Sequence, residues 1–396
     1  MSHRILVCAD TYPYPGDRGD RVRYGLFLDA MRSSYEVELV LIRRAAEAEE
    51  RPAPGAIDMT FGRTAIAGNL ARGLFGRVPA QFSGFRSADA ARTIAGSARH
   101  ADAFVALGAR AGTYRSAAHS LPALLDLQDS LVLNARSQWK GATGLPRRLY
   151  GADAILKAAP FEKKLVRSFD VVTVAGPADR DAVSQRNPGT DCRVIPSAVP
   201  LAVDVIDPRA NDARVLFLGD LRFAPNADAA KHLIDDIWPR VARLHPKARL
   251  SVVGHQPRAA LRRKLMRSGH QCAFSVPETT AYLRSSKVFV APMRLGSGIK
   301  VKVLHAMAHG VPVVMSGRAN QGIGAIPDVD ALVTDDPETF ARSVVRLLED
   351  DSLAHRLGLA GRALVADRFD PASICELFLE AVADVIRKGR TSGRDG

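Results

Sequence analysis

Short apolar, often β-branched runs alternate with segments of helical periodicity along the whole chain. In its first half the expected strands are Arg4–Ala9, Val37–Ile42, Ala103–Leu107, Ala123–Asp126, Val171–Val174 and Val194–Ile195. Helical patterns separate them, including Arg86–Ala98 and Ala152–Ser168. This alternation is typical of α/β proteins with a parallel sheet.

The pattern starts again in the second half. The expected strands there are Val215–Gly219, Arg249–Gly254, Val288–Ala291 and Val311–Met315. The expected helices are Asn226–Leu244, Arg258–Ser268, Glu278–Arg284, Ile299–His309, Pro337–Glu349, Leu353–Phe369 and Pro371–Arg387. Between the halves, the stretch from Pro196 to Asn211 holds three prolines and no clear periodicity, as an interdomain linker would.

Length and composition support two globular domains. A chain of 396 residues exceeds the roughly 250–300 residues that one hydrophobic core usually serves. With 47% hydrophobic and 24% charged residues, the composition is that of a folded protein. No apolar run approaches the ~20 residues of a membrane span. Met1–Asp10 resembles a buried strand rather than a secretory signal, so we expect a cytoplasmic protein.

The net charge of +13 favours anionic partners such as a nucleotide diphosphate or an acidic membrane surface. A nucleic acid is not an expected partner, because the charge comes without aromatic stacking motifs or a known binding module. The four cysteines are scattered without metal-ligand spacing, so no metal site is expected.

The most informative segment runs from Ala291 to Val314. An apolar strand leads into the turn Gly296-Ser297-Gly298, and a helix is expected directly after it. Unpaired N–H groups at the positive end of a helix form a site for a diphosphate. Glycines let the backbone approach phosphate oxygens closely. The alternative is a tight strand-to-helix turn with solvated lysines.

Cations flank this turn. Arg294, Lys300 and Lys302 can add charge-assisted hydrogen bonds to a phosphate. A dinucleotide-binding dehydrogenase is disfavoured, because Val301 occupies the third glycine position and no acidic residue follows at about 20 residues.

Several motifs together carry a family resemblance. They are Phe217-Leu-Gly-Asp-Leu-Arg-Phe-Ala-Pro-Asn226, Trp238-Pro-Arg, His245-Pro-Lys-Ala-Arg-Leu-Ser-Val-Val-Gly254, the 291–314 segment, Tyr14-Pro-Gly-Asp-Arg-Gly-Asp-Arg-Val-Arg23 and Leu125-Asp-Leu-Gln-Asp-Ser130. With them the chain resembles retaining GT-B glycosyltransferases of the family 4 (group 1) type, and is most similar to bacterial exopolysaccharide sugar transferases.

The resemblance implies two Rossmann-like domains facing a deep cleft. Residues 1–200 would bind the acceptor and residues 201–370 the nucleotide sugar, and a helix within 371–396 would cross back to the first domain. The acceptor would be a polysaccharide, a glycolipid precursor or a small natural product. Transfer would proceed with retention, without a cofactor and without a metal.

The resemblance also implies site residues. Diphosphate-stabilising, catalytic roles fall to Arg222, Arg294 and Lys300. Donor-binding roles fall to Gly219, Gly296, Ser297, Gly298, Ile299 and His305, with Gly16 and Gly19 from the N-terminal loop. Acceptor-side roles fall to Arg18, Arg21, Asp126 and Asp129. Arg222 can equally be a solvated loop arginine and Asp129 a helix cap, and Asn226 is expected to cap the helix that follows it.

His305 departs from the family pattern, in which a glutamate usually holds the ribose hydroxyls. A neutral imidazole offers one acceptor where a carboxylate offers several. We expect His305 to contact ribose through one ring nitrogen and to titrate near pH 6.5. The alternative is that it packs against Met307 or the adjoining strand.

A basic amphipathic pattern covers Arg63–Phe82, with Ile66 and Leu70 among its apolar positions. It can rest on an anionic membrane, at the inner membrane face, or pack on the first domain.

Three other functions compete with glycosyl transfer. One is a related GT-B nucleotide-sugar epimerase, the second is a nucleotide-sugar-binding pseudoenzyme or partner subunit marked by His305, and the third, a nucleic-acid binder, is remote.

Overall fold

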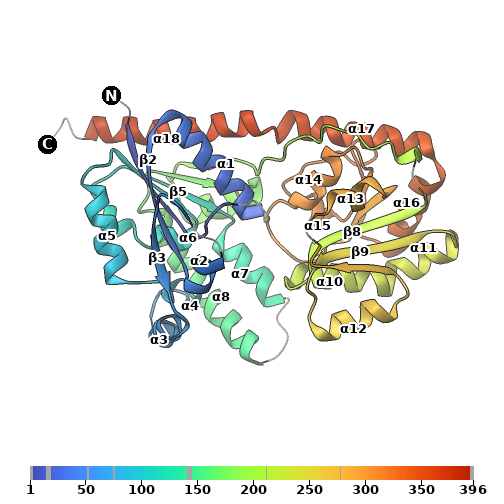
Figure 1. The fold of residues 1–396 in the computed structure, drawn as a ribbon, viewed down its shortest axis with the longest axis horizontal. Helices are drawn as coiled ribbons and strands as arrows, with labels where there is room; N and C mark the ends of the chain where they lie inside the picture. The colour runs from blue at the N-terminus through green and yellow to red at the C-terminus, as the bar shows by residue number, and fades with distance from the viewer. Residues whose placement is uncertain are drawn as a thin grey trace. The chain divides into compact units, whose positions relative to one another are not determined.

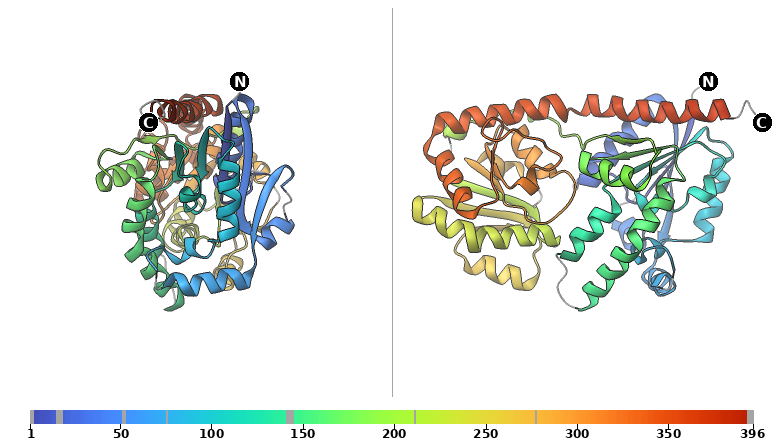
Figure 2. Two further views of the ribbon diagram at one scale, coloured as in Figure 1. Left: turned by 90° about the vertical axis from the view of Figure 1, so that its left-hand side faces the viewer. Right: turned by 180° about the vertical axis from the view of Figure 1, so that it is seen from behind.

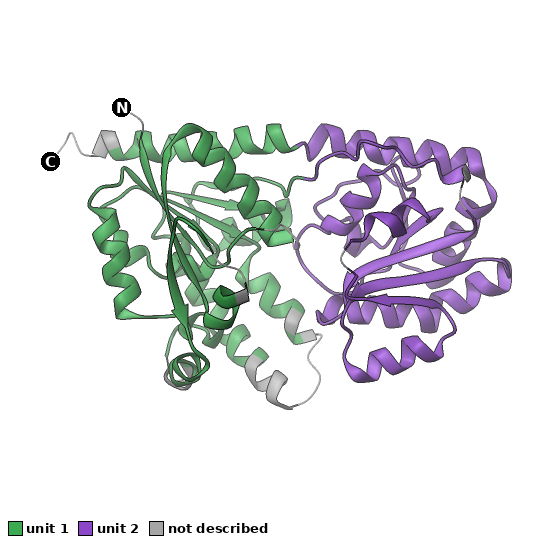
Figure 3. Cartoon of the chain, in the orientation of Figure 1, with its two compact units in different colours: residues 1–198, 371–396 green, residues 199–370 purple. Residues whose placement is uncertain are grey.

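The chain forms two compact units in the computed structural model, which describes residues 3–14, 19–50, 53–74, 76–140, 145–210, 212–276 and 278–392. Unit 1 comprises Met1–Ala198 and Pro371–Gly396, and unit 2 comprises Val199–Asp370 (Figure 3). The sequence places the corresponding boundaries after residues 200 and 370.

Unit 1 is built on a seven-stranded parallel sheet of order β3-β2-β1-β4-β5-β6-β7 (Figure 1). Its strands are β1 (Arg4–Ala9), β2 (Glu36–Arg44), β3 (Ala56–Phe61), β4 (Ala103–Leu107), β5 (Ala123–Gln128), β6 (Val171–Val174) and β7 (Cys192–Val194). Its helices are α1 (Gly19–Ser34), α2 (Ala45–Glu50), α3 (Arg63–Leu74), α4 (Ala80–Ser83), α5 (Ala88–Ala98), α6 (Ala109–Gly112), η1 (Arg115–Ala118), α7 (Leu131–Lys140), α8 (Leu145–Val166), α9 (Pro177–Arg186) and α18 (Pro371–Ser392). Helices α7 and α8 lie side by side (Figure 2).

Alternation along β1 builds two apolar layers in unit 1. Ile5 and Val7 face a core shared with α1 and α18, whereas Leu6 and Cys8 face a core shared with α5 and α8. Successive side chains of a strand point to opposite faces, so a strand covered on both faces is a continuous apolar run. This is why β1 is recognisable from the sequence.

Unit 2 is built on a six-stranded parallel sheet of order β10-β9-β8-β11-β12-β13. Its strands are β8 (Arg214–Asp220), β9 (Arg249–His255), β10 (Gln271–Phe274), β11 (Val288–Ala291), β12 (Val313–Met315) and β13 (Leu332–Val333). Its helices are η2 (Pro208–Ala210), α10 (Ala224–His232), η3 (Leu233–Ile237), α11 (Trp238–Leu244), α12 (Ala259–Arg267), α13 (Thr280–Arg284), α14 (Val301–Ala308), α15 (Gly317–Asn320), α16 (Pro337–Glu349) and α17 (Asp351–Arg368). Figure 1 shows α10, α11 and α12 on one side of β8 and β9, and α13 and α14 on the other.

Three strands were not expected from the sequence, namely β3, β10 and β13, and each lies at an edge of its sheet. Their residues are mostly partly buried or exposed, so the apolar run that marks a central strand is absent. The helix expected over residues 226–244 is present as the continuous segment of α10, η3 and α11. Its middle turn, η3, is π-helical and ends just before Trp238 and Pro239; the proline ring has no N–H and clashes with the carbonyl four residues earlier in a regular α-helix.

The Arg63–Phe82 pattern divides into α3 and α4, with Pro79 at the N-cap of α4. Ile66 and Phe82 pack against the core of unit 1. Within the described residues, no helix combines the length and the apolar character that a membrane crossing requires.

Helix α18 packs in unit 1 although it follows unit 2 in the sequence. Ile374, Phe378, Val382 and Val385 form a buried stripe at helical spacing. Phe378 stacks on Phe27 of α1 with ring centroids 3.8 Å apart and planes within 3°. The apolar contact therefore joins the last helix to the first.

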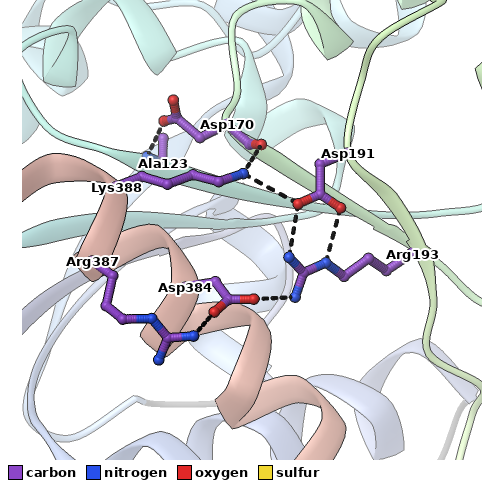
Figure 4. Close-up of polar contacts among 7 residues, drawn as sticks. All are labelled: Ala123, Asp170, Asp191, Arg193, Asp384, Arg387 and Lys388. Atoms are coloured by element: carbon purple, nitrogen blue, oxygen red, sulfur yellow. Dashed lines mark hydrogen bonds and ion pairs between the residues drawn. The ribbon is translucent and has the colours of Figure 1, made fainter. Parts of the chain in front are cut away.

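Ion pairs fix the end of α18 beside β7 (Figure 4). Arg193 of β7 donates to Asp384 of α18 at 2.7 Å and to both oxygens of Asp191 at 2.9 and 2.7 Å. Lys388 Nζ donates to Asp191 Oδ2 at 3.1 Å and to the carbonyl of Asp170 at 3.3 Å. The hydrogen bonds from Arg193 are the main cause that lowers the pKa of Asp191.

A buried ion pair connects α1 to β5. Arg23 Nε and Nη2 donate to the two oxygens of Asp126 at 2.8 and 2.7 Å, and Thr173 adds a third hydrogen bond at 2.7 Å. Arg23 Nη1 donates to the carbonyls of Ile195 and Pro196 at 2.7 and 2.9 Å. Asp126 is fully buried. Its expected acceptor-side role is therefore wrong, because both oxygens are already engaged inside the unit.

Replacing Asp126 with Ala should lower the free energy of unfolding by about 3–5 kcal/mol, because Arg23 would stay buried without its carboxylate. The control is Asp89→Ala, which breaks an ion pair with Arg92 whose side chains are 73% and 74% exposed. Exposed pairs contribute at most about 1 kcal/mol. Urea unfolding of both variants checks this, and equal losses would contradict the role of the buried pair.

Candidate functional site

The loop from β11 to α14 carries the turn singled out in the sequence. Gly296 and Gly298 have φ angles of 104° and 71°, in the left-handed region that residues with a Cβ rarely adopt. A Cβ on Gly296 would also lie 3.3 Å from Cβ of Pro225, near the start of α10. Backbone conformation therefore requires glycine in this turn, and the turn packs against α10.

Lys300 closes the turn from within. Its Nζ donates to the carbonyls of Ser297 and Gly298 at 2.8 and 2.6 Å, and the residue is 9% exposed. Lys300 is also the N-cap residue of α14 and makes no side-chain capping bond. The first N–H groups of α14 and one ammonium group thus share the carboxyl edge of the sheet, an arrangement suited to an anion.

The two candidate catalytic arginines are paired with carboxylates. Arg222 forms a two-point pair with Asp220 at 2.8 and 3.1 Å. Burial raises the pKa of Asp220, but the hydrogen bonds from Arg222 lower it more, so the net shift is downward. Arg294 forms a similar pair with Asp228 at 2.7 and 3.1 Å.

Arg294 lines a cavity of about 430 Å³ beyond the carboxyl ends of β11, β12 and β13. His232, Ser316, Arg318, Asp335 and Phe340 are among its other lining residues. His232 in turn hydrogen-bonds Asp236 at 2.6 Å. The structure therefore places Arg294 among side chains of α10, η3 and the β12 loop.

Asn226 has a different role from the expected helix cap. The N-cap of α10 is Phe223, and Asn226 lies inside the first turn. Its Nδ2 donates to the carbonyl of Asp220 at 3.1 Å, and its Oδ1 accepts from Lys302 Nζ at 2.8 Å. The side chain thus bridges the end of β8 to the start of α14.

Two glycines at the ends of β8 and β9 allow this bridge. A Cβ on Gly219 would lie 3.0 Å from Cγ of Asn226. A Cβ on Gly254 would lie 2.0 Å from the carbonyl oxygen of Gly219, a distance that no real contact allows. Gly219 therefore allows close packing against Asn226. At position 254 a glycine is required because the backbone of β8 leaves no space for a side chain.

Lys302 was singled out only as a flanking cation. Its ammonium lies 4.7 Å from the ring centre of Phe217, in addition to the bond with Asn226. Burial, with the nearby Lys300 ammonium as second cause, lowers the pKa of Lys302 to about 7. The sequence signal for this contact is the lysine at the second position of a helix that follows a glycine turn. Its partner, Asn226, lies 76 residues earlier and cannot be identified from the pattern.

The remaining donor-side candidates lie on the same loop and helix. Ile299 is packed beneath Gly322, where a Cβ would lie 2.8 Å from its Cγ1. His305 is partly buried, and its carbonyl accepts a bond from His309 Nδ1 at 2.7 Å. Burial, then the charge of His309, lowers the pKa of His305 to about 4. The expected titration near pH 6.5 is therefore wrong, since desolvation disfavours the imidazolium form.

Unit 1 holds the acceptor-side candidates. Gly19 is the first residue of α1, whereas Gly16 and Arg18 lie outside the described residues. Arg21 is 6% exposed and donates to Glu47 Oε1 at 3.0 Å. Asp129 is partly buried and follows Gln128, a non-glycine residue with a φ of 63°. In the described part of the chain, no group of three or more His, Cys, Asp or Glu side chains is placed to hold a metal ion.

The sequence of the chain is similar to those of known glycosyltransferases. Residues 212–350 match the family model "Glycosyl transferases group 1". A phosphatidyl-myo-inositol mannosyltransferase of Mycobacterium tuberculosis is 27% identical over 250 residues, which are 58% of this chain and 62% of that protein. The chain spans about half to three-fifths of the length of the curated relatives it matches.

Solved structures resemble nearly the whole chain. Sucrose-phosphate synthase from Thermosynechococcus elongatus superposes with a TM-score of 0.73 at 16% identity, covering 97% of this chain and 100% of that one. Anabaena HepE in complex with UDP gives a TM-score of 0.70 at 15% identity, covering 96% and 100%. The chain therefore has the GT-B fold of two parallel-sheet Rossmann-like domains, and its residues 212–350, which carry the glycine turn, match the model of the group 1 glycosyltransferases.

Proposed function

We propose that the protein is a glycosyltransferase that moves a sugar from a nucleotide-diphosphate sugar to an acceptor hydroxyl. The observation that carries this proposal is the Gly296–Lys300 turn, where two glycines, a helix start and an inward-facing ammonium meet. The turn lies within the segment that matches the group 1 glycosyltransferases. Complexes of HepE with UDP and with UDP-glucose support a nucleotide-sugar donor by analogy of fold.

The donor diphosphate would occupy this turn. As the bond between the sugar and the diphosphate breaks, negative charge grows on the phosphate oxygens. The N–H groups of α14 and Lys300 would stabilise that charge without reorganising. Arg222 can contribute if the phosphate displaces Asp220 from its guanidinium. The acceptor oxygen bonds to the sugar carbon, and its proton passes to the leaving phosphate.

Further details of the proposal follow the family resemblance. Unit 2 would bind the nucleotide sugar, and unit 1 the acceptor, with transfer proceeding by retention. Among the described residues, Arg21 and Asp129 remain the candidates for the acceptor side. A polysaccharide, a glycolipid precursor or a natural product would supply the hydroxyl, and no metal or other cofactor is assigned a step.

Replacing Lys300 with Ala should weaken the binding of a nucleoside diphosphate by ~1.5–3 kcal/mol, the range for hydrogen bonds to charged groups. This corresponds to about 10- to 150-fold in dissociation constant. Titration calorimetry with UDP, GDP and ADP measures it. Lys247→Ala, at an exposed residue between α11 and β9, is the control. Unchanged affinity for every nucleotide bound by the parent protein would place the diphosphate elsewhere.

Substitutions of His305 test whether the protein catalyses transfer or only binds the donor. If it faces the ribose, His305→Glu should strengthen donor binding and raise turnover, and His305→Ala should lower both. Because the pKa of His305 is about 4, removing the imidazole in His305→Ala should leave the pH profile between pH 6 and 8 unchanged. Steady-state kinetics with a nucleotide sugar that the parent protein uses as a donor measures KM, kcat and their pH dependence. Parent-like constants in both variants would place His305 outside the site.

A nucleotide-sugar-binding protein without transferase activity is the second candidate, favoured by the imidazole at position 305. That result would appear as donor binding without turnover in the parent protein, with activity gained in His305→Glu.

A further inference from the structure

Asn226 and Lys302 form a polar bridge across the start of α10 and the start of α14. Asn226 donates through Nδ2 to the Asp220 carbonyl, which fixes its amide so that Oδ1 faces the Lys302 ammonium at 2.8 Å. Gly219 makes room for this side chain, because a Cβ there would lie 3.0 Å from Cγ of Asn226. The amide is therefore held in one orientation, and it holds the ammonium in one place.

The partner of Lys302 is neutral, which is unusual for a largely buried ammonium. Buried charges are normally paired with an opposite charge, because an amide compensates only part of the lost hydration. The face of Phe217 adds an attraction of the cation–π kind. Among the described residues, the charge that acts most on Lys302 is that of Lys300, which is repulsive.

The other charged and titratable groups around the bridge are already engaged. They are Asp220, paired with Arg222; Asp228, paired with Arg294; Lys300, bonded to two carbonyls; and His305, neutral above pH 5. None of the carboxylates among them forms an ion pair with Lys302 in the described structure.

We propose that Lys302, positioned by Asn226, is a second cation of the diphosphate site and takes up one proton from solvent when the diphosphate binds. The inference rests on the proposed function. In the empty site, repulsion from Lys300 and burial favour the neutral amine, and near neutrality a large share of the molecules carry it. An arriving diphosphate reverses both effects, since its negative charge favours the ammonium form.

The sign of the pH dependence follows from this linkage. The diphosphate binds better to the protonated form, which predominates below about pH 7 in the free protein. Above that pH each binding event must bring a proton, so affinity falls by up to about tenfold per pH unit. Titration of the nucleotide itself affects every variant equally and cancels in the comparison.

The experiment is titration calorimetry with UDP, GDP and ADP at pH 6, 7, 8 and 9, each in two buffers of different ionisation enthalpy. The variants are Lys302→Met, which keeps an aliphatic chain against Phe217, and Asn226→Asp, which offers the ammonium a carboxylate. Lys247→Met is the control. Thermal melting identifies any variant that does not fold, and Asn226→Ala replaces Asn226→Asp if the latter is unfolded.

The parent protein and the control should take up a fraction of a proton approaching one at pH 8, with affinity falling as the pH rises. Lys302→Met should bind at least about tenfold more weakly at pH 6, the loss of one charge-assisted contact, and should lose the uptake. Asn226→Asp should also lose the uptake, because its ammonium is already charged. Asn226→Ala should bind the nucleotide more weakly at pH 6, because the Lys302 ammonium loses the acceptor that positions it.

Two results would overturn the proposal. The first is that the affinity of Lys302→Met for nucleotides has the same pH dependence as that of the parent protein, with equal proton uptake. If Lys300→Ala still weakens binding in that case, the proposed function stands and only the role of Lys302 falls. The other is the absence of binding by any of the three nucleotides, which removes both.

Discussion

The placement of two lysines, Lys300 and Lys302, at the start of α14 is the constraint on which the carboxyl edge of unit 2 depends. The glycine turn brings both to the start of α14, where the helix dipole is already positive. Carbonyl oxygens hold one ammonium and an amide oxygen holds the other. These neutral acceptors orient both side chains. In the proposed diphosphate site, Lys300 and the first N–H groups of α14 would supply positive potential before a ligand binds, as preorganised stabilisation requires, whereas Lys302 would gain its full charge with the ligand.

The arginines of the molecule behave differently from these lysines. A guanidinium fork fits both oxygens of a carboxylate, so an arginine near an aspartate tends to form a two-point pair. Arg222, Arg294 and Arg23 all do so. The net charge of +13 is therefore a poor guide to where an anion binds. What matters is which cations form ion pairs with carboxylates, and sequence alone does not show this pairing.

The sequence could predict features that depend on local patterns of residues. Central strands such as β1 and β11 are buried on both faces and carry continuous apolar runs, so their positions follow from the pattern. Edge strands such as β3 lack that signal. Local backbone demands were also predictable, as the positive φ angles of Gly296 and Gly298 show.

Long-range pairing was not predictable. Asp126 is the last residue of the strand expected from the sequence, the usual place for a ligand-binding carboxylate, but Arg23 lies 103 residues earlier and occupies both of its oxygens. Asn226 lay one turn away from a plausible cap position, and its actual partner comes from another helix. In both cases the side-chain type was informative about chemistry, while the fold decided which partner used it.

The imidazole at position 305 and the unpaired ammonium at position 302 have a common physical basis. Residues three apart on a helix are neighbours, so a carboxylate at 305 would lie one turn from Lys302 and favour its charged form. With a histidine that burial keeps neutral, α14 offers Lys302 no such compensation. Replacing the glutamate of the family pattern with histidine therefore removes the acidic residue that α14 would otherwise place one turn from Lys302. In the proposed site, the charge of Lys302 would then depend on the ligand and on pH rather than on the protein alone.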